Sequence, residues 1–554
     1  MQRSATPPTP ALLQATTTLA LGLLLVTGCA DGRESASSLR GYTTNVTLGD
    51  DDGGGPGCDD TGQKTDVNPR RSLFETSQAA LAQLSMEAVL TSMATDAGLT
   101  PQAELTHDQF VDTYNEGPGL GLGQHCDDFE AFDGEPGING YPYESCPRAE
   151  GDQIGNLDGW RPIAAVNRFD LAPSDGSHCG EARLVFANNE GGRFFTIFEA
   201  QIPNPDPGCG IDACEPVQRF WADLSENPGK RAQELEAAFI SGHPGLLADG
   251  FGPFMSQRNM TFGTGQIRTN NFDQGPWSLR EFKAVAVADP TPGISADLTK
   301  PFEPGVLRMV EVPVAANPFG PLWNDTFVDE NGMALPFAET CQQAFVDTVQ
   351  HLMADDLNLM AVSVPPECLA AESPNRPVMD YAAALLAGGS PKDPDSLQAR
   401  IKAEILANDP ASDLEPIHIA RRAEFAGGCI GCHLRSGGVD LGNGVTGIPT
   451  GFVHTSEFAG NFGCGDGDSP CFPVSAAVRD EFLPHREAVM EQFLNGGPCC
   501  DADTITPISP AEPIAVEATE LADIDVAALM DAEALQESLA SPVTVSGASS
   551  RRSH

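Results

Sequence analysis

The 15 cysteines of this 554-residue chain constrain its fold more than any other feature. Cys29 follows an apolar N-terminal run, and Cys429 and Cys432 form a close pair, which leaves an even number of 12. In an oxidising compartment an even number predicts disulfides, here up to six. Short separations favour the pairs Cys126–Cys146, Cys209–Cys214, Cys341–Cys368 and Cys464–Cys471. The partners of Cys58, Cys179, Cys499 and Cys500 stay open.

The N-terminal residues indicate export. Arg3 gives a thin positive region, residues 19–26 form an apolar core too short to span a bilayer, and Val26-Thr27-Gly28-Cys29 follows. These four residues resemble the lipobox of bacterial lipoproteins, which implies cleavage before Cys29 and attachment of diacylglycerol to its thiol. A secretory signal cleaved by small-residue rules and a short uncleaved anchor are the alternatives. We therefore expect a lipid-anchored protein of the cell envelope, on the periplasmic or outer-surface face of a bacterial membrane.

The charge of the chain limits its partners. It carries 78 acidic against 31 basic residues, a formal net charge of -47. A polyanion repels phosphates, so nucleic acid is excluded as a partner. An acidic surface keeps an exported protein soluble, and the alternative use of this charge is to steer the protein toward a basic redox partner.

Composition divides the chain into five segments. We expect a signal peptide over residues 1–28, and a flexible tether over 29–71, with an acidic, glycine-rich stretch at 50–57. Residues 72–410 mix helical and strand-like patterns and predict an α+β region of unknown role. Residues 411–505 predict a mostly α-helical domain, and 506–554 a largely disordered acidic tail rich in alanine and proline. The predicted fold class of the whole chain is α+β.

Local patterns predict several elements between residues 72 and 410. A hairpin is expected over 182–203, because two runs rich in Val, Phe and Ile flank Asn188-Asn189-Glu190-Gly191-Gly192. Strand-like runs occur at 260–268 and 279–287. Helical spacing occurs in five stretches: 72–98, 217–224, 230–240, 336–364 and 379–406.

The most specific motif is Cys429-Ile430-Gly431-Cys432-His433. It resembles the haem-attachment motif of c-type cytochromes, in which two thiols add to the haem vinyl groups and the histidine binds the iron. The chain's own frequencies of Cys and His predict about 0.01 chance matches over its length. The resemblance implies one covalent haem c, attached through Cys429 and Cys432, with His433 as an axial iron ligand.

The sequence before the motif extends this resemblance to class I cytochromes c. Glu415-Pro416 and Gly427-Gly428 bound a predicted helix, on which Phe425 matches an aromatic position of that family. The resemblance therefore implies a cytochrome c-like domain over 411–505. Two departures weaken it. Arg421 stands where the family has glycine, and residues 437–442 replace the family's Pro-Asn-Leu segment.

Two other classes of site compete for the same cysteines. A disulfide oxidoreductase places its CxxC pair at the start of a helix that follows a strand, and no such pattern precedes Cys429. A zinc site made of Cys429, Cys432, Cys464 and Cys471 leaves the adjacent His433 unexplained.

Three downstream residues are candidates to complete the haem site. His454, beside Phe452 and Val453 in an apolar stretch, is the favoured sixth iron ligand, and Met490 is the alternative. An open site and a ligand from the preceding region also remain. Arg486 lies on the apolar face of a predicted helix and is a candidate partner for a haem propionate. An acidic partner, or a helix break at Pro484 that redirects Arg486, would also account for this position.

These residues predict an exported, lipid-anchored mono-haem c-type cytochrome that transfers electrons. One alternative is a haem-dependent oxidoreductase whose substrate binds to residues 72–410. Another is a haem-binding sensor or structural lipoprotein. No catalytic residue is assigned, because an enzyme needs an open polar pocket beside the haem edge and the sequence does not reveal one.

Overall fold

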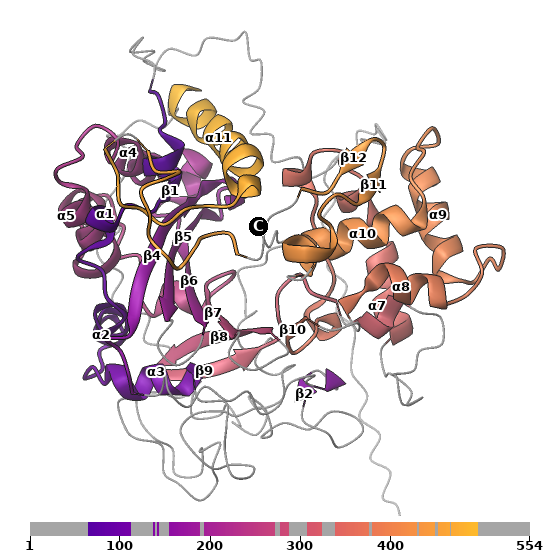
Figure 1. The fold of residues 1–554 in the computed structure, drawn as a ribbon, viewed down its shortest axis with the longest axis horizontal. Helices are drawn as coiled ribbons and strands as arrows, with labels where there is room; N and C mark the ends of the chain where they lie inside the picture. The colour runs from indigo at the N-terminus through magenta and orange to yellow at the C-terminus, as the bar shows by residue number, and fades with distance from the viewer. Residues whose placement is uncertain are drawn as a thin grey trace, which may run out of the picture. The chain divides into compact units, whose positions relative to one another are not determined.

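The strands of the middle region pair into one antiparallel sheet (Figure 1). The computed structural model describes residues 65–111, 137–138, 141–142, 155–188, 193–271, 277–286, 307–318, 320–323, 338–375, 379–428, 431–448, 453–465 and 467–496. Within these residues eight strands form the order β1-β4-β5-β6-β7-β8-β10, with β9 beside β10 on the same edge of β8. They are β1 (Phe74–Glu75), β4 (Trp160–Arg168), β5 (His178–Asn188), β6 (Phe194–Pro203), β7 (Gln266–Asn271), β8 (Ser278–Ala286), β9 (Leu307–Val312) and β10 (Ser373–Pro374).

The hairpin predicted over 182–203 is confirmed as β5 and β6. The two strands pair antiparallel with Leu184 opposite Phe198, and β5 ends at Asn188, where the predicted turn begins. Nearly every residue of both strands is buried or half-buried, so both faces of the sheet are covered. The strand predicted at 279–287 is confirmed as β8, whereas β7 begins only at Gln266, after a short 3-10 helix at Arg258–Met260.

The described residues also form eleven α-helices. They are α1 (Gln78–Leu81), α2 (Met86–Asp96), α3 (Ala103–Val111), α4 (Glu215–Asp223), α5 (Arg231–Glu236), α6 (Pro244–Ala248), α7 (Ala338–Val346), α8 (Tyr381–Ala387), α9 (Leu397–Asn408), α10 (Pro416–Gly427) and α11 (Leu483–Gly496). The helical spacing over 72–98 is confirmed only in part, because α1 and α2 form within it but residues 74–75 form β1. Phe74 pairs with Val166 of β4, and Ser77 forms a β-bridge with Cys471, so non-local pairing overrides the local helical spacing.

The prediction of a mostly α-helical, cytochrome c-like C-terminal domain is also wrong. Between α10 and α11 the described chain is largely irregular, with only the small hairpin β11 (Asp440–Gly442) and β12 (Val445–Thr446) and two short π-helices. Helix α11 packs against α4 and against η4 (Phe169–Leu171), where the rings of Phe169 and Phe493 lie 4.6 Å apart. The apolar face of α11, which was expected to form the core of an independent domain, is therefore buried against the sheet region. The fold is a mixed α+β structure built around a large antiparallel sheet.

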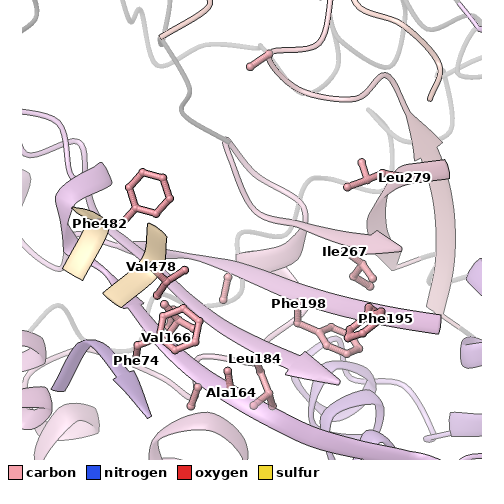
Figure 2. Packing of buried hydrophobic residues seen from close by; sticks show 14 of the residues in the cluster. Phe74, Ala164, Val166, Leu184, Phe195, Phe198, Ile267, Leu279, Val478 and Phe482 are labelled. Atoms are coloured by element: carbon pink, nitrogen blue, oxygen red, sulfur yellow. The ribbon is translucent and has the colours of Figure 1, made fainter. Parts of the chain in front are cut away.

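One hydrophobic core joins the two parts of the sequence. It includes buried residues from Val67 to Leu494. In Figure 2, Val478 and Phe482 from the C-terminal segment lie beside Phe74 and Val166 of the sheet. Helix α10 packs against α8 and α9, and a Cβ on Gly427 would lie 1.9 Å from the carbonyl oxygen of Ala316, so the end of α10 closely approaches the middle region.

Two of the four predicted disulfides are confirmed, Cys341–Cys368 and Cys464–Cys471. The pair Cys209–Cys214 is wrong, because Cys214 is bonded to Cys179. Antiparallel pairing places the start of β5 beside the end of β6, which brings Cys179 close to the segment that follows β6. Cys209 is itself disulfide-bonded. Cys126, Cys146, Cys58, Cys499 and Cys500 lie outside the described residues.

The predicted signal peptide, Cys29, most of the tether and the tail lie outside the described residues as well. Within the described part of the chain, no helix is both long enough and apolar enough to cross a membrane.

Candidate functional site

A cavity of about 140 Å³ lies between the sheet and the C-terminal segment. Strands β4 to β8 contribute one part of its wall, and residues 432–433, 453–455 and 478–486 contribute another. Cys432, His433, His454 and Arg486 all line this cavity, so it gathers four of the site residues predicted from the sequence.

Helix α10 and the turn after it place the second half of the motif in the cavity. The predicted helix bounds are confirmed, with Glu415 as N-cap and Gly428 as C-cap. The backbone N–H of Cys432 donates to the carbonyl oxygen of Gly428 over 3.2 Å. A Cβ on Gly431 would lie 1.9 Å from the carbonyl oxygen of Glu424, so only glycine fits at position 431. Cys429 and Ile430 lie outside the described residues.

The two histidines of the predicted iron site face each other. The ring centroids of His433 and His454 are 4.4 Å apart, with an angle of 50° between the ring planes. Trp277 presents its edge to His433 at a centroid distance of 5.8 Å, and Phe482 lies 6.1 Å from His454. The two imidazoles therefore share one cavity with aromatic neighbours, and the rings would have to move apart for an iron to lie between them.

A short antiparallel contact holds His454 in place. Ser475 donates its backbone N–H to the carbonyl oxygen of His454 over 2.8 Å, and Thr455 forms a β-bridge with Val474. The Nδ1 atom of His454 lies 3.4 Å from the hydroxyl oxygen of Ser475. This contact orients the imidazole ring while its Nδ1 is engaged.

Met490, the alternative ligand, does not line the cavity. Its side chain is fully buried in α11, it is not among the cavity-lining residues, and its sulfur lies 3.7 Å from the Nδ2 of Asn167. The described chain thus brings His454, rather than Met490, to His433.

Sequence analysis missed three arginines of the cavity wall: Arg168 of β4, Arg183 of β5 and Arg268 of β7. Arg183 forms ion pairs with Glu181 at 2.7 Å and Glu199 at 3.0 Å. Arg268 pairs with Glu281 at 2.7 Å. Cross-strand neighbours share a face of the sheet, so these opposite charges compensate one another beneath the cavity.

Arg168 and Arg486 meet at Asp170. Arg168 donates from Nε and Nη2 to the two carboxylate oxygens of Asp170, each over 2.9 Å. The Nε of Arg486 lies 3.7 Å from the same carboxylate, and its guanidinium lies 5.9 Å from the ring centroid of Phe482. Arg486 therefore has the acidic partner that sequence analysis gave as an alternative to a propionate.

Most of the remaining cavity wall is apolar. These wall residues have aromatic or branched aliphatic side chains, and such a surface suits a ligand with an apolar body. The residues are Phe74, Ile163, Val166, Val185, Phe195, Ile197, Trp277, Leu279, Val453, Val478 and Phe482. Two of them are labelled in Figure 2, Leu279 on β8 and Phe482 on the C-terminal segment.

A buried carboxyl group, that of Glu424, lies on the helix that leads into the motif. Burial raises the pKa of Glu424 to about 7, and this rise outweighs the opposing effect of Arg435, whose guanidinium lies 3.8 Å away. Glu424 is 4% exposed and lies on the last turn of α10, where its carbonyl oxygen accepts from the N–H of Gly428.

The competing sites do not fit this arrangement. The four-cysteine zinc site is wrong, because Cys464 and Cys471 are bonded to each other and have no thiolate to offer. Within the described residues, no group of three or more His, Cys, Asp and Glu side chains is arranged to hold a metal ion. The CxxC pair follows the end of α10 rather than a strand, unlike the setting of a disulfide oxidoreductase.

No family model matches this chain, and no curated protein or solved structure is similar to it.

Proposed function

We propose that this chain is an exported, lipid-anchored protein that holds one haem covalently in the cavity and transfers single electrons. The observation that carries the proposal is the position of His433. It follows the second cysteine of a haem-attachment motif, lines a largely apolar cavity and lies 4.4 Å from a second imidazole. The resemblance to c-type cytochromes is then confined to the attachment motif and does not extend to their fold.

The cavity residues fit the chemical groups of a haem. Cys429 and Cys432 supply the thiols for the vinyl groups, and His433 and His454 supply imidazoles for the iron. The apolar wall suits the porphyrin body, and Arg486 suits a carboxylate. When bound, haem supplies a centre that exchanges one electron at a time.

The same residues favour a carrier over an enzyme. If His433 and His454 both bound the iron, no position would remain on it for a substrate, and the wall around it would be largely apolar. The acidic chain, at a net charge of -47, favours a basic redox partner. Anchoring through Cys29 rests on the lipobox-like residues Val26 to Cys29 alone.

An anaerobic redox titration of the haem-loaded protein tests this function. A carrier gives a reversible one-electron transition, and its reduced form does not bind carbon monoxide because both axial positions are filled. If the reduced protein binds carbon monoxide at once and a small-molecule substrate reduces the haem, the protein is an oxidoreductase and not an electron carrier.

A further inference from the structure

Among the described residues, one guanidinium nitrogen of the cavity wall is without a hydrogen-bond partner. Arg168 is 2% exposed and lines the cavity. Its Nε and Nη2 atoms donate to Asp170, but its buried Nη1 meets no acceptor in the part of the chain that the structure describes. Buried donors in folded proteins nearly always have a partner, and a charged donor without one is especially costly. A ligand in the cavity that Arg168 lines could supply the acceptor that Nη1 needs.

The surroundings of Arg168 define the chemistry of that acceptor. Asp170 holds the guanidinium by two parallel hydrogen bonds, which fixes its plane and leaves the N–H groups of Nη1 for another acceptor. Arg486 approaches Asp170 within 3.7 Å, so a second cation stands beside the first. Planar guanidinium groups bind carboxylates more strongly than neutral acceptors. An anionic oxygen on a ligand with an apolar body satisfies both Arg168 and the cavity wall.

We propose that Arg168, with Arg486 beside it, is the carboxylate-binding residue of this cavity. The identity of the carboxylate rests on the proposed function: in a haem protein it is a propionate. A free carboxylate offers the same chemistry, and the experiment below separates the two sources. Arg183 and Arg268 serve a different role, because they compensate the glutamates of the sheet.

The test uses the full chain with Cys429→Ser and Cys432→Ser, so that haem binds without covalent attachment. Hemin and hemin dimethyl ester are titrated by absorbance. The two ligands share the iron and the ring and differ only in the propionate charges. We expect hemin to bind at least about 10-fold more tightly than hemin dimethyl ester. Arg168→Gln lowers the hemin affinity to that of the ester and leaves the ester affinity unchanged, whereas Arg168→Lys gives an intermediate loss.

Two controls separate binding from folding. Arg219→Gln removes an exposed arginine of α4 that pairs with Glu215, and should leave both affinities unchanged. In Arg168→Gln, Asp170 keeps Arg486 as a partner, and the thermal unfolding midpoint reports any loss of fold. A hemin affinity that stays within two-fold in a folded Arg168→Gln variant overturns the proposal.

A third titration, with succinate, distinguishes failure of this inference from failure of the proposed function. If neither porphyrin binds but succinate binds and loses affinity in Arg168→Gln, the haem function fails and the carboxylate site stands. If hemin binds equally well with and without Arg168, the haem function stands and this inference fails. If none of the three probes binds, both fail.

Discussion

His433, in the short π-helix Gly431–Arg435, and His454, in the irregular segment that follows residue 452, meet in the cavity with ring centroids 4.4 Å apart. One imidazole follows the attachment motif, and the other is positioned by the contact of its loop with residues 474–475. A ligand that binds His433 in this cavity would therefore meet a second imidazole, once the two rings have moved apart to admit it.

The first prediction concerns the sixth ligand. His454→Ala should open one axial position, so that the reduced protein turns high-spin and binds carbon monoxide at once. Met490→Ala should leave the spectra unchanged and instead lower the free energy of unfolding by about 2–5 kcal/mol, because it empties a buried site in α11. The reverse result, with carbon monoxide binding only in Met490→Ala, would assign the ligand to the methionine.

The second prediction concerns Gly431. Gly431→Ala places a methyl group against the carbonyl oxygen of Glu424, so the turn between the cysteines must distort and haem attachment should fall strongly. The haem absorbance per mole of purified protein measures this loss. Gly229→Ala is the control, because its added Cβ meets no atom within 4 Å, and it should retain full attachment. Normal haem content in Gly431→Ala would show that the turn differs from the one described.

The third prediction concerns pH. Burial raises the pKa of Glu424 from 4.5 to about 7, so between these values the folded state keeps a proton that the unfolded state releases. The contribution of Glu424 to the free energy of unfolding is fully present below pH 4.5. It falls as the pH rises toward 7, with a slope of up to about 1.4 kcal/mol per pH unit.

Denaturant unfolding of Glu424→Gln across this range provides the measurement. The variant lacks the ionisable group. The difference in free energy of unfolding, variant minus wild type, should therefore increase from pH 4.5 to 7 and then level off. Glu87→Gln, at an exposed position of α2, should show no such trend. A constant difference between Glu424→Gln and wild type over the whole range would contradict the raised pKa.

The fourth prediction concerns the membrane anchor. If lipid on Cys29 is the anchor, Cys29→Ser should move the exported protein from the membrane fraction to the soluble fraction. The acidic chain adds no attraction to anionic lipids. A variant that stays membrane-bound through washes at high salt would require another anchor or a membrane partner.

Local signals predicted the elements that depend on local chemistry. Proline and glycine bounded α10, and alternating runs around a polar turn marked the β5–β6 hairpin. The disulfides Cys341–Cys368 and Cys464–Cys471 followed from short separations. Proximity in sequence failed for Cys214, whose partner Cys179 becomes close only once the strands pair.

The cavity arginines could not be recognised in the sequence for a physical reason. Arg183 alternates with apolar residues in β5, and Arg268 lies among polar residues in β7; both patterns usually mark a solvent-facing side of a strand. Here both faces of the sheet are covered, and glutamates on neighbouring strands make the buried charges tolerable. The C-terminal domain was predicted wrongly for a related reason, since an apolar helix face does not say which part of the chain will cover it.

Mass spectrometry of the protein matured in a host with haem-attachment machinery tests the central claim most directly. The account predicts an intact mass increased by one haem that survives acid–acetone extraction, and loss of this stable attachment when Cys429 and Cys432 are both replaced by serine. His243→Ala, at a position paired with Glu234 and away from the cavity lining, should keep the haem. An intact mass without haem, or with a zinc ion in its place, would contradict the account.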